Sequence, residues 1–415
     1  MNVLFKNIKE LIQVRETAID FLSGKEMNVL PTLKNAFLLV ENGLISDFGF
    51  MEDCPDIEIK TIDATGKMIL PSWCDSHTHL VYAGNREDEF VDRINRLSYK
   101  EIADNGGGIL NSAKRLQETS EEDLYNQSKI RLENIIQLGT GAVEIKSGYG
   151  LTKEAELKML RVVKKLNTDY PIEIKATFLG AHAVPENYKD NKSGYLQMLI
   201  DDILPAIQKE NLADFIDIFC ETGYFSVADT QQILAAGKKY NLIGKIHVNQ
   251  FTAIGGIHAG IKNDVLSVDH LEEMGTEDIN ALKGTKTMPV ALPSCSYFLS
   301  ILYTPARRMI DEGLPIALAT DYNPGSAPSG NMNFVVATAC IKMKMTPEEA
   351  INAATINGAY AMNLQDKVGS ITKGKLANLI LTKEINSYHF IPYSFGNHSI
   401  EKVFLKGKEI KQPFL

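Results

Sequence analysis

Two histidines with one residue between them, His77 and His79, follow the apolar run Met68 to Leu70. On an extended strand, residues i and i+2 point to the same side, so both imidazoles can reach one point. A divalent metal ion is the usual occupant of such a point. The alternative is a polar strand end that binds nothing, and the pair alone does not decide between the two.

Further along the chain, four residues with metal-binding or proton-transferring side chains also follow short apolar runs: His182, His247, His270 and Asp321. Five of the eight histidines therefore fall at the ends of expected strands. Histidines scattered at random would not gather in this way. For His247 and His270 the alternative is a hydrogen-bonded histidine of the core, which is the weaker interpretation because each stands at a strand end.

Three imidazoles and a carboxylate can hold one metal ion and leave room for a water molecule. Such an ion lowers the pKa of the water toward roughly 7 and provides hydroxide at neutral pH. Asp321 is suited to take up the proton and pass it to a leaving nitrogen. His270 is suited to hydrogen-bond the hydroxide or the developing oxyanion. This set of residues predicts a metal-dependent hydrolase.

Composition excludes several other classes. The net charge of −9 argues against a nucleic-acid-binding protein, which normally presents a basic face. The five cysteines are scattered and odd in number, as expected for free thiols in a reducing cytoplasm. The first residues do not resemble a secretory signal, and no apolar run reaches the roughly 18 residues of a membrane span. We expect a cytoplasmic protein that binds neither membrane nor nucleic acid.

Strand patterns dominate both ends of the chain. Residues 36–40 and 44–50 flank Asn42-Gly43 and predict a β-hairpin. Residues 375–381 and 402–405 also read as strands. Because the N-terminal segment is too small to bury much core, we expect the two ends to pair. The predicted unit is a composite β-sandwich domain of residues 1–67 and 365–415.

Between the ends, residues 68–364 alternate short apolar runs with helical segments. Together with the run before His77, the expected strands are Ala142 to Lys146, Glu173 to Leu179, Phe215 to Cys220, Gly244 to Val248, Val265 to Val268, Thr287 to Ala291 and Ile316 to Ala319. Eight such units close into an α/β (β/α)₈ barrel of the TIM type, whose sites lie where strands end.

Several sequence blocks resemble the amidohydrolase superfamily and, within it, the imidazolonepropionase family. The resemblance covers nearly the whole chain. The blocks are residues 73–86, which include His77 and His79, Tyr99 to Ile102, Gly106 to Ile109, Ile145 to Leu151, Phe178 to Pro185, Asp269 to Glu272, and Ala319 to Ser326. The blocks around Tyr149 and His182 are specific to this family within the superfamily.

The resemblance implies hydrolysis of the ring C–N bond of 4-imidazolone-5-propanoate to N-formimidoyl-L-glutamate in histidine degradation. It implies one zinc or iron ion on His77, His79, His247 and Asp321, and a homodimer. The substrate contacts that it implies are Arg86, Tyr149, His182, Gln250, Asn323, Gly325 and Ser326. Arg86 suits a carboxylate because its guanidinium can bind it through two parallel hydrogen bonds. Taken in isolation, however, Arg86 is better interpreted as forming a surface salt bridge with Glu87 or Asp88. The turn that contains Asn323 can direct backbone N–H groups toward the same carboxylate.

Some positions depart from the family pattern. Gln250 stands where some members carry a glutamate that handles a proton, so at this catalytic position the role falls to Asp321 or His270. Ser326 replaces a threonine and keeps the hydroxyl, and Asn378 replaces an aspartate far from the chemistry. We interpret Lys146 as structural and the Gly106 to Gly108 run as a tight loop.

Two other functions remain open from the sequence. One is a related deaminase or cyclic amidase that acts on another substrate, against which Arg86, Tyr149 and His182 argue. The other is a non-catalytic barrel that serves as an assembly protein. Such proteins usually lose metal ligands, whereas this chain carries the whole expected set.

Overall fold

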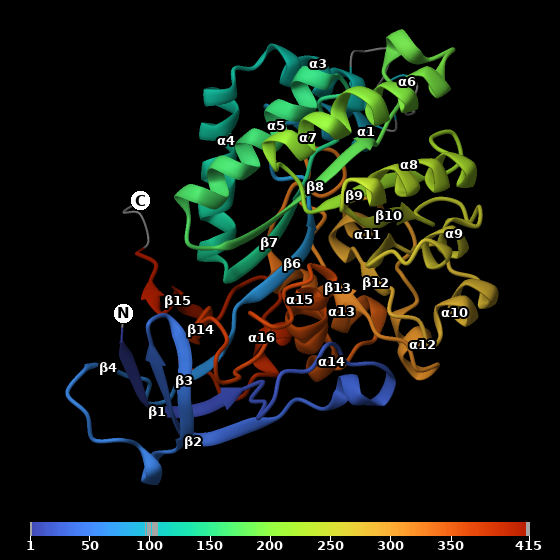
Figure 1. The fold of residues 1–415 in the computed structure, drawn as a ribbon. Helices are drawn as coiled ribbons and strands as arrows, with labels where there is room; N and C mark the ends of the chain where they lie inside the picture. The colour runs from blue at the N-terminus through green and yellow to red at the C-terminus, as the bar shows by residue number, and fades with distance from the viewer. Residues whose placement is uncertain (1, 96, 98–100, 102–106, 412–415) are drawn as a thin grey trace.

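The computed structural model describes residues 2–95, 97, 101 and 107–411. Tyr99, Lys100, Ile102 and Gly106, which belong to the blocks named above, lie outside the described residues. Figure 1 shows a sheet built from both ends of the chain on one side of the molecule, and the central part of the chain with its helices on the other.

Eight parallel strands form the central sheet, in the order β13-β12-β11-β10-β9-β8-β7-β6. Their bounds are β6 Trp73–Thr78, β7 Thr140–Lys146, β8 Glu173–Ala181, β9 Phe215–Cys220, β10 Ile243–Val248, β11 Ser267–His270, β12 Met288–Ala291 and β13 Ala317–Leu318. The two edges meet where Thr78 bridges Tyr322 and where the Asp321 N–H donates to the His77 carbonyl at 3.0 Å. The predicted (β/α)₈ barrel is confirmed.

The first barrel strand is not the one that we expected. The run Met68 to Leu70 forms β5 (Met68–Pro71), which pairs with β1 (Val3–Ile12) and β14 (Leu379–Thr382) in the sheet of the chain ends. The first barrel strand is β6, which the sequence did not predict because most of its residues are polar rather than apolar. These residues are buried, and Asp75 has partners there: it accepts hydrogen bonds from the Thr320 N–H and hydroxyl at 3.0 and 2.7 Å.

Helices follow the barrel strands, as in a β/α alternation, and one more, α16, lies in the C-terminal segment that also forms strands of the sheet of the chain ends. Their bounds are α1 Glu87–Ile94, α3 Gly108–Glu118, α4 Glu121–Gln137, α5 Lys153–Asp169, α6 Lys192–Met198, α7 Leu204–Glu210, α8 Val227–Lys239, α9 Gly256–Lys262, α10 Thr276–Leu282, α11 Pro293–Leu299, α12 Ala306–Asp311, α13 Met332–Met343, α14 Pro347–Asn352, α15 Gly358–Ala361 and α16 Phe390–Tyr393. The longer ones begin at side-chain caps: Ser120, Thr152 and Ser226 accept hydrogen bonds from the first turns of α4, α5 and α8.

The sheet of the chain ends has the order β16-β15-β14-β5-β1-β2-β3, with β4 beside β1. Its other strands are β1 Val3–Ile12, β2 Thr32–Glu41, β3 Leu44–Phe50, β4 Lys60–Asp63, β14 Leu379–Thr382, β15 Ile400–Leu405 and β16 Lys408–Glu409. The hairpin between β2 and β3 turns at Asn42 and Gly43, whose φ angles of 54° and 84° are those of the expected turn.

This sheet folds onto itself. The rings of Phe5 in β1 and Phe404 in β15 lie 5.0 Å apart, although β14 and β5 separate their strands in the sheet order. Neighbouring strands are about 4.8 Å apart, so a flat sheet would hold these rings much farther from each other. The expected pairing of the two chain ends is confirmed. We propose that residues 1–67 and 365–415 form one composite domain, to which β5 adds a strand.

Among the described residues, the structure contains no helix that is both long enough and apolar enough to cross a membrane.

We predict that Phe404→Ala lowers the free energy of unfolding by about 3–5 kcal/mol, because it removes a buried ring that joins the two chain ends. The measurement is urea denaturation followed by circular dichroism. Tyr393→Ala is the control, since this side chain is 79% exposed. Equal stability of the two variants would show that the contact between the ends contributes little.

Candidate active site

Three histidines and one aspartate converge at the carboxyl ends of the barrel strands. His77 is in β6, His79 follows it, His247 is in β10 and Asp321 follows β13. The Nε2 atoms of His79 and His247 are 3.4 Å apart. Asp321 Oδ1 lies 3.5 Å from His77 Nε2 and 3.6 Å from His79 Nε2. All four side chains are buried.

This group fits a divalent metal ion. One ligand atom from each of His77, His79 and His247 lies within 4.8 Å of the other two, and among the described residues His77 Nε2 has no hydrogen-bond partner. Burial lowers the pKa values of His77 and His79 well below their ordinary value, which keeps both rings neutral and able to donate lone pairs. Imidazole nitrogens with one carboxylate oxygen suit zinc or iron.

Behind these ligands lies a layer of buried charged residues that the sequence analysis did not assign to the site. Asp269 Oδ2 is 2.7 Å from His77 Nδ1, and Asp217 Oδ2 is 3.0 Å from His247 Nδ1. Lys146 Nζ lies 2.8 Å from Asp217 and 3.5 Å from Asp269. The signal was present in the sequence as charged residues inside apolar runs, such as Asp217 in Phe215 to Phe219.

His270 lies beside the cluster with its own carboxylate partner. Its Nδ1 atom is 3.6 Å from Glu272 Oε2, and its ring centroid is 5.6 Å from that of His77. Burial lowers the pKa of His270, but Glu272 and then Asp321 outweigh burial and raise it above its ordinary value. Burial raises the pKa of Asp321. A histidine and an aspartate so placed can exchange protons with a bound molecule.

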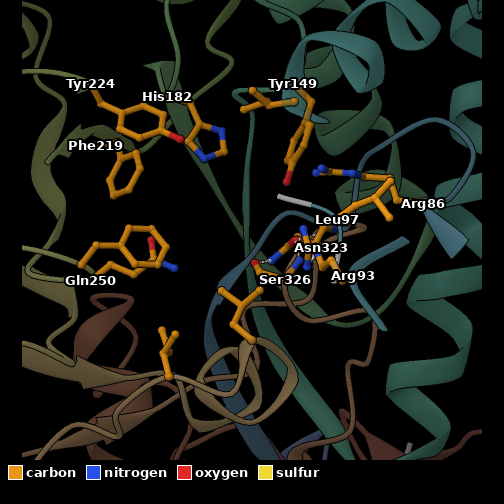
Figure 2. Close-up of a pocket in the computed structure, with 15 residues that line it drawn as sticks. Arg86, Arg93, Leu97, Tyr149, His182, Phe219, Tyr224, Gln250, Asn323 and Ser326 are labelled. Atoms are coloured by element: carbon orange, nitrogen blue, oxygen red, sulfur yellow. Dashed lines mark hydrogen bonds between the residues drawn. The ribbon is translucent and has the colours of Figure 1, made fainter. Parts of the chain in front are cut away.

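A cavity of about 350 Å³ opens beside these residues. Figure 2 shows Arg86 and Tyr149 on one side of it, His182, Phe219 and Tyr224 on another, and Asn323 and Ser326 between. Its lining includes all the expected substrate contacts: Arg86, Tyr149, His182, Gln250, Asn323, Gly325 and Ser326. Among the described lining residues, Arg86 and Arg93 are cationic and none is an aspartate or a glutamate.

Arg86 does not form the surface salt bridge considered above. Its Nε donates to Glu89 Oε2 at 2.8 Å, and each side chain is 10% exposed. Glu87 and Asp88 are exposed in the first turn of α1, whereas Glu89 is buried and pairs with Arg86. Glu89 also accepts from the Gly108 N–H at 3.0 Å, which joins the start of α3 to the same carboxylate.

The turn at Asn323 corrects a second expectation. Its side-chain oxygen accepts the N–H groups of Gly325 and Ser326 at 2.7 and 2.8 Å. These N–H groups are therefore directed to the turn itself rather than toward a bound carboxylate. Arg93, which was not predicted, donates to the Gly325 carbonyl at 2.9 Å and holds the turn from the other side.

Gln250 and His182 meet different neighbours. The Gln250 amide donates to Cys295 Sγ at 3.4 Å. The His182 ring stacks on His79 with centroids 5.2 Å apart and planes 10° apart. Burial lowers the pKa of His182 to about 3, so this ring is neutral.

Comparisons with known sequences agree with this site geometry. The sequence model of the amidohydrolase family matches residues 68–410. An imidazolonepropionase of Flavobacterium johnsoniae is 68% identical over 411 residues, which cover 99% of this chain and 100% of the relative. The chain belongs to the imidazolonepropionase family. An imidazolonepropionase of Clostridium tetani is 40% identical and is matched over 98% of this chain and 97% of its own length.

Solved structures of more distant proteins share the fold. E. coli guanine deaminase superposes with a TM-score of 0.77 at 14% identity, with all of both chains covered. A triazine hydrolase variant gives 0.76 at 15% identity, covering 98% of this chain and 94% of its own. At these identities the likeness concerns the barrel and its accessory sheet. This chain therefore shares its fold with these two proteins.

We predict that Asp217→Asn weakens metal binding about 10–100-fold, because the amide holds the His247 ring less firmly and removes a negative charge behind it. The measurement is competition with a chelator of known affinity. Asp214→Asn, in the segment just before β9, is the control because Asp214 pairs with Lys175 instead. Unchanged metal affinity in Asp217→Asn would contradict the assigned orientation.

Proposed function

We propose that this chain hydrolyses the ring C–N bond of 4-imidazolone-5-propanoate and releases N-formimidoyl-L-glutamate, a step of histidine degradation. The observation that carries the proposal is the cavity beside His77, His79, His247 and Asp321, which is lined by two arginines. A small flat ring with an anionic tail matches both its volume and its charge. Full-length relatives with this activity in their names support the same substrate.

Recognition is divided between the two sides of the cavity. Arg86 binds the propionate carboxylate through its guanidinium fork, a geometry that lysine does not offer. Tyr149 and His182 contact the polar edges of the imidazolone ring, and Ser326, whose hydroxyl donates to Asp321 Oδ2 at 3.3 Å, lines the same cavity. The ring carbonyl is thereby directed toward the histidine cluster.

His77, His79, His247 and Asp321 would hold the metal ion, which would supply the Lewis acidity that makes water a nucleophile at neutral pH. Asp321 takes the proton of the attacking water and delivers it to the departing ring nitrogen. His270 donates a hydrogen bond to the oxyanion that develops on the ring carbonyl. Gln250 accepts no proton, so it binds substrate while Asp321 and His270 handle the protons.

A deaminase acting on a neutral base is the alternative that the shared fold raises. The two arginines of the cavity disfavour it, because their guanidinium groups suit an anionic tail, which a neutral base lacks. A non-catalytic barrel is disfavoured because the ligand set is complete and buried. Zinc or iron as the resident ion, a cytoplasmic location and a homodimer belong to the same proposal.

We predict that the purified, metal-loaded protein consumes imidazolonepropionate, followed as loss of its ultraviolet absorbance. Guanine is the comparison substrate, and a preference for guanine would reject the proposal. Elemental analysis of the same preparation identifies the ion.

Asp321→Asn is expected to lower kcat about 100-fold or more, because the amide cannot accept the proton. Circular dichroism checks that the fold is kept. Near-normal turnover by a folded Asp321→Asn protein would remove Asp321 from the proton path.

Arg86→Lys is expected to raise KM about 10-fold with a smaller effect on kcat, because lysine keeps a positive partner for Glu89 but loses the fork. The matched control is Arg115→Lys, an exposed arginine that donates to the Asn85 carbonyl. An unchanged KM for Arg86→Lys would place the carboxylate elsewhere in the cavity.

A further inference from the structure

The loop between β7 and α5, residues 147–151, is wrapped around one buried carboxylate. Glu156 Oε2 accepts the Gly148 N–H at 3.0 Å. Glu156 Oε1 accepts the N–H groups of Gly150 and Leu151 at 2.8 and 2.9 Å. Glu156 is completely buried. Three backbone donors of five consecutive residues thus share one carboxylate.

The two glycines of the loop make this wrapping possible. A Cβ atom on Gly150 would lie 2.5 Å from the Glu156 backbone nitrogen. Gly148 has a φ of +104°, and a Cβ atom there would lie 2.8 Å from the Leu179 carbonyl oxygen. A larger residue at either position would push the loop off the carboxylate. The Ser-Gly-Tyr-Gly-Leu block is therefore explained by how closely its backbone approaches Glu156.

This loop builds one side of the cavity in two ways. It carries Tyr149, whose side chain lines the cavity (Figure 2). It also presents the Gly148 carbonyl 3.0 Å from His182 Nδ1. A carbonyl only accepts hydrogen bonds, so His182 Nδ1 carries the hydrogen and Nε2 is the acceptor of the neutral ring. The loop therefore places one residue and selects the tautomer of another.

The carboxylate is not needed to begin α5. Thr152 caps that helix by accepting the Ala155 N–H at 3.3 Å. Glu156 lies beyond the cap and turns back to the loop, where its charge also suits the positive end of the helix. What Glu156 adds to the structure is the shape of residues 147–151.

We propose that Glu156 is a positioning residue for ring recognition, which acts by fixing Tyr149 and the hydrogen-bonding state of His182. The inference deepens the proposed function, since it concerns how the same cavity recognises the imidazolone ring. The cavity would then select substrates whose ring offers an N–H to the His182 Nε2 acceptor and a polar edge to Tyr149.

The test compares Glu156→Gln with the control Glu154→Gln, an exposed acid in the same first turn of α5. The probe is imidazole-4-propanoate, whose dissociation constant is measured by calorimetry on metal-loaded protein. We expect Glu156→Gln to weaken binding about 10-fold, since one amide oxygen cannot replace two carboxylate oxygens, and Glu154→Gln to leave it unchanged. Repeating the comparison in Tyr149→Phe protein should give a smaller loss, because the two changes act through one contact.

Two further measurements do not depend on the substrate. Hydrogen exchange at the amides of residues 148, 150 and 151 should accelerate at least 10-fold in Glu156→Gln and remain slow in the control. Nitrogen-15 NMR should find the His182 hydrogen on Nδ1 in the parent protein and shared between both nitrogens in Glu156→Gln. If Glu156→Gln does not fold, Gly150→Ala displaces the same loop with the carboxylate retained and should show the same loss of binding.

Full additivity of the Glu156 and Tyr149 changes, or a His182 tautomer that Glu156→Gln leaves unaltered, would overturn the proposal. So would unchanged ligand binding in both loop variants. Failure of the parent protein to turn over imidazolonepropionate would reject the proposed function instead, since hydrogen exchange and the tautomer still report on Glu156.

Discussion

The site depends on pairing the buried carboxylates behind its metal-ligand histidines with a cation, because water cannot reach these groups. Carboxylates behind His77 and His247 fix the orientation of these two rings, and buried carboxylates are costly unless cations pair with them. Lys146 meets this need by contacting both Asp217 and Asp269. Glu144 in turn lies 2.6 Å from Lys146 and also contacts Lys245. The metal-ligand histidines thus lie at the carboxyl-end side of an ion-pair network in the interior of the barrel.

The barrel geometry makes such a network possible. Alternate residues of each strand point inward, so Glu144 and Lys146 of β7 reach the same interior as Lys245 and His247 of β10. The register pairs His247 with Asp269 across β10 and β11. Asp269 is therefore level with His247, although the imidazole that it contacts is that of His77.

The sequence predicted the histidine positions because strand ends of a barrel meet at one rim, and the cavity contacts because whole sequence blocks resemble one family. It misassigned β5 because the apolar run of Met68–Pro71 suits either sheet, whereas the true barrel strand β6 is polar. The sequence could not predict where the N–H groups of Gly325 and Ser326 point, because the acceptor that they use is the side chain of Asn323 in the same turn. Glu89 and Glu156 were missed because each belongs to the amphipathic start of a helix, where acids are ordinary.

The sheet of the chain ends has a consequence for how the protein is made. Strand β5 emerges from the ribosome early, but its neighbour β14 is translated only after the whole barrel. Until then the nascent chain presents an edge of unpaired backbone groups, the kind of surface on which aggregation starts. Completion of the accessory sheet is thereby postponed to the end of synthesis.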